Sequence, residues 1–148
     1  MIRDRINVID YCMERALTGC DVPAMTREQI VEFLGTQDIS GIELCHAYWA
    51  DCSPQYIARL ATNAGKPIRT YIFYADLAVV PDRIDESVSH AKRLIDRSVE
   101  IGARQAMIVP AQVKEEHPLA EQTRWMIEGL TRCAEHAGSC GLLLSRNP

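Results

Sequence analysis

The residues with the clearest chemical potential lie in and just after one short apolar segment. Residues 41–45 read Gly-Ile-Glu-Leu-Cys, so Glu43 is a carboxylate inside an apolar run, and His46 follows at its end. Burying a carboxylate without a partner is expensive, so Glu43 needs either a structural partner or a function. Glu43 could orient a substrate hydroxyl or instead pair with an arginine or a backbone donor. His46 could bind substrate oxygen or a metal, or be a solvated loop histidine.

The elements that must position these residues alternate between strand and helix. Runs rich in β-branched and aromatic residues predict five strands, at residues 6–9, 41–45, 68–73, 105–109 and 141–145. Capping signals and helical spacing of apolar residues predict four main helices, at residues 26–34, 54–64, 81–101 and 119–137. This alternation indicates parallel strands joined by right-handed crossovers.

Local signals refine the helices. Thr26 and Gln29 fit a capping box, and Gly35 and Gly138 are expected to end the first and last helices. The helix from Pro81 is expected to be the longest. Residues at helical spacing predict the buried stripes, which are Ile30, Val31, Phe33 and Leu34 in the first helix, Ile84, Val88, Ala91, Ile95 and Val99 in the third, and Met126 or Ile127, Leu130, Cys133 or Ala134 and Ala137 in the last. The aromatic segment 46–52 is expected to be a loop.

The length of 148 residues suits one domain, residues 1–148, and five strands in that length fit two architectures. One is the (βα)4β half of a TIM barrel, whose full length is about 250 residues. The other is a flavodoxin-like doubly wound sheet of five strands. The segment after the first strand, residues 10–14, lacks the Gly, Ser and Thr residues of a phosphate-binding loop, and no lysine follows the last strand as in a phospho-receiver.

Composition excludes several classes of partner. The chain has a net charge of -4 and a pI near 5.5, so it lacks the basic surface of a nucleic-acid-binding protein. No apolar run is long enough to cross a membrane, and the charged start lacks the core of a signal peptide, which predicts a cytoplasmic protein. The six cysteines form no Cys-x-x-Cys pair and are expected to be reduced thiols.

Several segments resemble one family. Residues 41–44 with the aromatic loop after them resemble the second strand of the xylose-isomerase-like TIM barrels, which include sugar-phosphate isomerases and epimerases and the endonuclease IV group. Residues 95–103, Ile-Asp-Arg-Ser-Val-Glu-Ile-Gly-Ala, resemble the end of a helix in that family. Residues 107–110 resemble its fourth strand, and residues 128–137 resemble the helix before its fifth. The resemblance covers about residues 26–147, as the N-terminal half of the barrel.

The resemblance implies where a site would lie. Active sites of TIM barrels gather at the carboxyl ends of the strands, where Asp10 and Asn147 also lie. The substrate-binding residues expected there are Glu43, His46, Trp49, Tyr74, Asp76 and Gln112. Trp49 and the nearby Tyr48 could stack on a sugar ring or simply cover the core. Asp76 could equally be a turn residue, and the loop 112–118 is expected to be a solvated acidic surface.

The family implies a divalent metal, Mn, Mg, Co or Zn, but this chain departs from the family's ligand pattern. The fifth strand usually ends in a metal-binding glutamate, whereas residues 142–148 read Leu-Leu-Leu-Ser-Arg-Asn-Pro. The other family ligands lie on strands six to eight, which are absent. The prediction is therefore that no metal ligand of the family set is present, and that a catalytic residue cannot be assigned.

Two functions follow from these considerations. The resemblance implies a sugar or sugar-phosphate isomerase or epimerase that moves a proton next to a carbonyl with metal assistance and binds a small sugar or polyol. The alternative is a non-catalytic α/β half barrel that acts through self-association. A half barrel has two strand edges and an exposed inner face, so the chain is expected to form a homo-oligomer.

Overall fold

The computed structural model describes residues 6–13 and 23–146. The chain divides into two compact units, Met1–Tyr71 with Glu100–Ala103, and Ile72–Val99 with Arg104–Pro148. Each unit is described by itself below.

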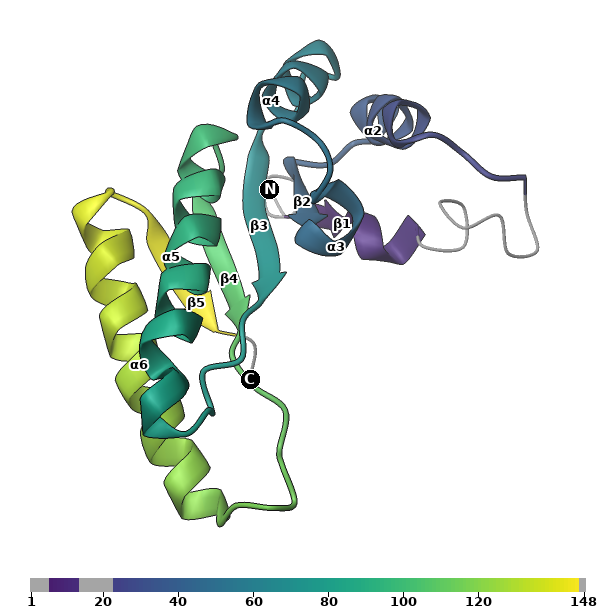
Figure 1. The fold of residues 1–148 in the computed structure, drawn as a ribbon. Coiled ribbons are helices and arrows are strands. Elements are labelled where there is room, and N and C mark those ends of the chain that lie inside the picture. Colours follow the sequence, from purple (N-terminus) through teal and green to yellow (C-terminus); the bar gives the residue numbers. More distant parts are fainter. Residues whose placement is uncertain (1–5, 14–22, 147–148) are drawn as a thin grey trace. The chain divides into compact units, whose positions relative to one another are not determined.

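The strands form one hydrogen-bonded sheet in the order of the sequence (Figure 1). They are β1 (Asn7–Ile9), β2 (Gly41–Cys45), β3 (Ile68–Tyr74), β4 (Gln105–Val109) and β5 (Leu143–Arg146). A flavodoxin-like sheet has the order 2-1-3-4-5, so the observed order β1-β2-β3-β4-β5 excludes it. The order is that of consecutive strands in a TIM barrel, which confirms the prediction of a half-barrel fold.

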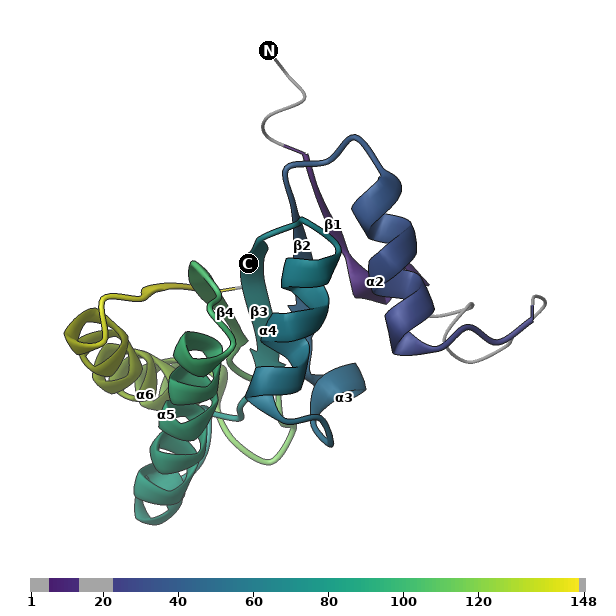
Figure 2. The same ribbon diagram turned by 90° about the horizontal axis from the view of Figure 1, so that it is seen from above.

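In the first unit, β1 pairs with β2 in parallel, with Val8 opposite Ile42. Helices α2 (Arg27–Thr36) and α4 (Pro54–Asn63) lie next to each other (Figure 2). The predicted capping box is confirmed, because Thr26 and Gln29 exchange side-chain to backbone hydrogen bonds. Phe33 is 45% exposed, so its predicted burial was wrong. The buried face of α2 centres on Ile30, Val31 and Leu34, and Phe33 projects about 100° away from it.

The segment after β2 is not the loop that the sequence predicted. A 3-10 turn, η2 (Asp10–Met13), follows β1, and a helical turn, α3 (His46–Trp49), follows β2 directly. The indole of Trp49 is buried and hydrogen-bonded to Asp10. This tertiary contact stabilises a turn that has little local support, since α3 has no side-chain N-cap hydrogen bond.

In the second unit, β4 and β5 pair in parallel, with Ala106 opposite Leu144. Helices α5 (Ile84–Glu100) and α6 (Leu119–Ser139) run side by side (Figure 1). A 3-10 turn, η3 (Pro81–Arg83), precedes α5, so the helix predicted from Pro81 begins later and is shorter than α6. No helix within residues 6–13 and 23–146 is long and apolar enough to span a membrane.

The buried faces of α5 and α6 differ in part from the predicted stripes. Val99 is 43% exposed, and Leu94 and Ser98 are buried in its place. Ile127 is 56% exposed, because the buried face of α6 consists of Gln122, Trp125, Gly129, Cys133 and Ala137. The predicted burial of Cys133 and Ala137 is confirmed, whereas Gln122, Trp125 and Gly129 were not predicted. A Cβ at Gly129 would lie 3.0 Å from Leu77 Cβ, so a larger residue would not fit there without a shift.

The end of α6 also differs from the prediction. Gly138 lies inside the helix. The glycine that follows the end of the helix with a positive φ is Gly141, at 70°. The amide of Gly141 donates to Gly138 O, and the amide of Leu142 donates to Ala137 O. These bonds satisfy carbonyl groups of the last helical turn, as in a Schellman motif.

We expect Gly35→Ala to destabilise the protein by about 1–3 kcal/mol. A Cβ at Gly35 would lie 2.8 Å from Ala64 O, which is a backbone atom at the end of α4 and cannot move away easily. The measurement is the free energy of unfolding in urea.

The matched control is Gly138→Ala, also within a helix, where an added Cβ meets nothing within 4 Å. There the higher helix propensity of alanine should leave stability unchanged or raise it by up to about 1 kcal/mol. Equal effects of the two substitutions would contradict the close packing of α2 on α4.

Candidate functional site

The first unit places four of the sequence candidates at or near the carboxyl ends of β1 and β2. These are Asp10, Glu43, His46 and Trp49. The second unit places Tyr74 at the end of β3, Asp76 just after β3 and Gln112 after β4. Asn147 lies outside the described residues.

Glu43 is half-buried and accepts hydrogen bonds from the side chains of its neighbours. Its Oε1 lies 3.3 Å from Thr70 Oγ1 and 3.4 Å from Asn7 Nδ2. Both donors are neutral side chains, so neither is the arginine or the backbone donor that the sequence analysis considered as a structural partner. The distances are longer than those of strong hydrogen bonds to carboxylates. A carboxylate has about four acceptor sites, so Glu43 retains capacity to accept a hydrogen bond from a ligand.

His46 is the first residue of α3 and is positioned by a tyrosine that the sequence analysis did not single out. Its Nδ1 lies 2.7 Å from the hydroxyl of Tyr71, and the two rings meet edge to face at 5.8 Å. Tyr71 is fully buried, and a buried tyrosine usually needs a partner for its hydroxyl. If the hydroxyl donates to Nδ1, the ring carries its proton on Nε2, which can then donate to a substrate oxygen.

Asp10 and Trp49 form a buried polar pair behind the strand ends. Asp10 is 1% exposed, and its two carboxylate oxygens accept from Trp49 Nε1 at 2.5 Å and from the Cys45 amide at 2.9 Å. Trp49 is also 1% exposed, so a sugar could stack on it only if the ring were uncovered. Burial raises the pKa of the neighbouring Cys45 thiol, and the Asp10 carboxylate adds to that rise. The pair holds η2, the end of β2 and α3 together.

In the second unit, Asp76 pairs with a lysine that the sequence analysis overlooked. Lys114 Nζ lies 2.8 Å and 3.0 Å from the two carboxylate oxygens of Asp76, and it also donates to Ala78 O. Asp76 accepts from the Ala78 amide as well, at 3.2 Å, so it is a turn residue in addition to an ion-pair partner. Lys114 lies in the loop that was expected to be an acidic solvated surface.

A buried glutamine shapes that loop. Gln122 of α6 accepts from the Lys114 amide at 2.9 Å and donates to the carbonyl groups of Lys114 and His117. It is 3% exposed, so these hydrogen bonds fix the loop that carries Lys114. No local signal distinguished Gln122 from a surface glutamine, because its partners are defined only by the fold.

Tyr74 and Gln112 are exposed. Tyr74 is the last residue of β3, and desolvation raises the pKa of its hydroxyl, with a further rise from the Asp76 carboxylate. Gln112 lines a small cavity of about 160 Å3 together with Ala78, Leu119 and Met126. This unit therefore offers a phenol at the carboxyl end of β3, and an amide and an ion pair in the segments that follow β3 and β4.

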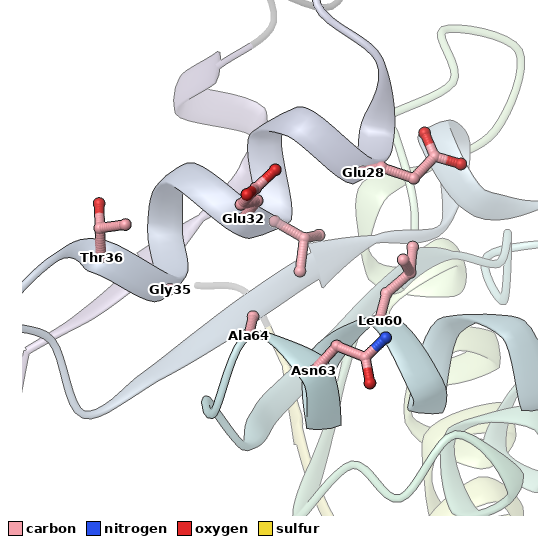
Figure 3. Close-up of a pocket in the computed structure, with 8 residues that line it drawn as sticks. Glu28, Glu32, Gly35, Thr36, Leu60, Asn63 and Ala64 are labelled. Carbon is pink, nitrogen blue, oxygen red and sulfur yellow. The ribbon is translucent and has the colours of Figure 1, made fainter.

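A groove of about 450 Å3 lies between α2 and α4 (Figure 3). Glu28 and Glu32 line it from α2, and Leu60 and Asn63 line it from α4. The groove lies between two helices rather than at the carboxyl ends of strands, and it contains none of the predicted site residues. Its position identifies it as a surface groove of the helical layer.

The described strand ends do not assemble the metal site that the resemblance implies. Within residues 6–13 and 23–146, the one group of three side chains placed to hold a metal is Asp96, His136 and Cys140. These residues lie on α5, on α6 and in the turn after α6. None of them follows the carboxyl end of a strand, so this group is not the family's ligand set.

Comparison with known proteins shows the fold. The sequence matches no protein-family model and no curated protein. Among solved structures, a sugar phosphate isomerase/epimerase from Parabacteroides distasonis is similar over 95% of this chain and 50% of its own, with a TM-score of 0.73 and 12% identity. A xylose isomerase domain-containing protein from Salmonella typhimurium is similar over 99% of this chain and 50% of its own, with a TM-score of 0.72 and 15% identity.

A D-allulose 3-epimerase from Methylomonas, solved with D-allulose, is similar over 80% of this chain and 44% of its own, with a TM-score of 0.67 and 12% identity. The chain spans about half the length of these proteins or less. The described chain therefore has the fold of one half of a TIM barrel, like the corresponding half of these proteins.

We expect Trp49→Phe to destabilise the protein by at least about 1 kcal/mol more than Trp125→Phe. Both indoles are buried, but Trp49 Nε1 donates to a buried carboxylate, whereas Trp125 Nε1 is buried with no hydrogen-bond partner in the described chain. Each substitution removes similar volume, so the difference reports the loss of the hydrogen bond to Asp10. Urea unfolding measures both values, and a smaller loss for Trp49→Phe would contradict a stabilising Asp10–Trp49 pair.

Proposed function

We propose that this chain forms the substrate-binding half of a carbohydrate isomerase or epimerase. The proposed reaction is proton transfer next to the carbonyl of a sugar or sugar phosphate. The observation that carries the proposal is Glu43, a half-buried carboxylate on β2 that is held by the neutral donors Asn7 and Thr70. The fold supports it, since several solved structures with the same half-barrel are sugar isomerases or epimerases by name.

The role proposed for the first unit is to bind and orient the sugar. Glu43 accepts a hydrogen bond from a substrate hydroxyl, and His46 donates from Nε2 while Tyr71 holds its Nδ1. In the second unit, Tyr74, Asp76 and Gln112 are the corresponding substrate-binding candidates, with Lys114 fixing the carboxylate of Asp76. Divalent-metal assistance, with Mn, Mg, Co or Zn, would require ligands from outside the described residues. The other half of the barrel would likewise come from outside these 148 residues.

We expect the full chain to bind D-fructose or D-allulose and Glu43→Gln to weaken that binding at least tenfold. A hydrogen bond to a charged acceptor contributes about 1.5–3 kcal/mol, which corresponds to a factor of roughly ten or more. Ligand-observed NMR titration with each sugar measures the dissociation constants.

Glu128→Gln is the matched control, because Glu128 is exposed on α6 and away from the strand ends. It should bind both sugars like the unmodified chain. Unchanged affinity in Glu43→Gln would remove Glu43 from the proposed site, and no binding of either sugar by the unmodified chain would contradict the proposed function.

A second candidate function is self-association without catalysis. Strands β1 and β5 are the two ends of the strand order, and an edge strand offers unpaired backbone groups to another chain. Large apolar side chains are exposed at both: Leu143 on β5 is 63% exposed, and Ile6 before β1 is 44% exposed. Pairing of two half barrels would cover these edges and supply a second set of strand ends.

The chain is expected to be a dimer or a larger oligomer in size-exclusion chromatography with light scattering. Leu143→Lys places a charge on the β5 edge and should shift the population toward monomer, whereas Ile127→Lys, on the exposed face of α6, should not. A monodisperse monomer of the unmodified chain would contradict self-association.

A further inference from the structure

We propose that Asp96, His136 and Cys140 form a zinc-binding site that fastens the end of α6 to α5. The three residues belong to the second unit and lie on helices, separate from the strand-end residues proposed to bind a sugar. The site would take one Zn²⁺ or a similar thiophilic divalent cation. This inference does not depend on the proposed isomerase or epimerase function.

The geometry brings one oxygen, one nitrogen and one sulfur ligand together. His136 Nε2 lies 2.7 Å from Asp96 Oδ1, and Cys140 Sγ lies 4.0 Å from the same oxygen. All three atoms fall within 4.8 Å of one another. Ligands of a tetrahedral zinc ion lie roughly 3.3–3.7 Å apart, so side-chain shifts of about 1 Å would convert this cluster into three corners of a tetrahedron.

The sequence spacing favours binding from one helical face. His136 and Cys140 are four residues apart, and the Cys140 amide donates to His136 O, so the helical path continues through the C-cap. Residues at this spacing lie one turn apart on the same side of a helix. Asp96 comes from the last part of α5, which runs beside α6 (Figure 1).

Electrostatics also favour a cation here. The site lies at the carboxyl end of α6, a 21-residue helix whose last carbonyl groups carry partial negative charge. Asp96 adds a carboxylate, and Cys140 would add a thiolate on binding, because zinc is held by the deprotonated form. The side chain of His136 is 25% exposed and that of Asp96 is 50% exposed, so an ion has access from solvent.

The ligand types select the class of metal. Sulfur with imidazole favours zinc over magnesium or calcium, which prefer oxygen ligands. Three protein ligands leave a fourth position for water. The turn that contains Cys140 leads into β5, and α5 leads into β4, so a bound ion would act as a cross-link where these helices end. The expected consequence is greater thermal stability in the presence of zinc.

The test is titration of the full chain with Zn²⁺ in competition with a chromophoric chelator. We expect one tight site per chain. His136→Gln, Asp96→Asn and Cys140→Ser should each weaken it at least about tenfold, since even residues that only support a metal ligand affect affinity by 10–100-fold. Zn²⁺ should raise the melting temperature of the unmodified chain but not of His136→Gln.

Two controls make the assignment specific. His90→Gln removes an exposed histidine of α5 that is not part of the cluster, and Cys12→Ser removes an exposed cysteine outside it. Both variants should bind Zn²⁺ like the unmodified chain. With Co²⁺ as the probe, the thiolate charge-transfer absorption should be present in the unmodified chain and absent in Cys140→Ser. Absence of tight Zn²⁺ binding by the unmodified chain would overturn the site and leave only the His136–Asp96 hydrogen bond. The same conclusion would follow if all three ligand variants bound Zn²⁺ as tightly as the unmodified chain.

Discussion

Parallel pairing of consecutive strands is the constraint on which the rest of the structure depends. Each parallel pair requires a crossover, and the crossover helices must cover the strands with an apolar face. The exposed fraction is at most 1% for Ala106 and Ile108 on β4 and for Val88 and Ile95 on α5. Every crossover begins at the carboxyl end of one strand and returns to the amino end of the next. The segments that follow the carboxyl ends therefore gather on one side of the sheet, where they can carry function.

The polar groups at these strand ends are paired across elements that are distant in sequence. Asp10 pairs with Trp49, His46 with Tyr71, and Asp76 with Lys114. Buried polar groups that lack partners are costly, so such pairs hold the turns in one conformation. Glu43 differs from Asp10 and Asp76, because its two side-chain donors lie 3.3 Å and 3.4 Å away, farther than the donors of those carboxylates. That difference makes it the carboxylate best suited to accept a ligand.

The helices α5 and α6 separate two kinds of chemistry within the second unit. The segments that enter these helices, which follow the carboxyl ends of β3 and β4, carry Asp76 and Lys114. The helix ends that lead into β4 and β5 carry Asp96, His136 and Cys140. In TIM barrels the face at the carboxyl ends of the strands is the usual place for substrate binding. The face at the amino ends of the strands contributes to stability. The proposed cross-linking metal lies where α5 and α6 lead into the amino ends of β4 and β5, which agrees with that division.

The sequence by itself determined the order of the strands and helices and most of their bounds. It also determined the capping box at Thr26, because such signals depend on neighbours a few residues away. Only the tertiary structure decided between the half barrel and the flavodoxin-like sheet, since both have the same alternation of elements and differ in strand order. The tertiary structure likewise decided which partners Lys114 and Cys140 have. Asp76 and Asp96 lie 38 and 44 residues away from them, a separation at which spacing in the sequence carries no information about contact.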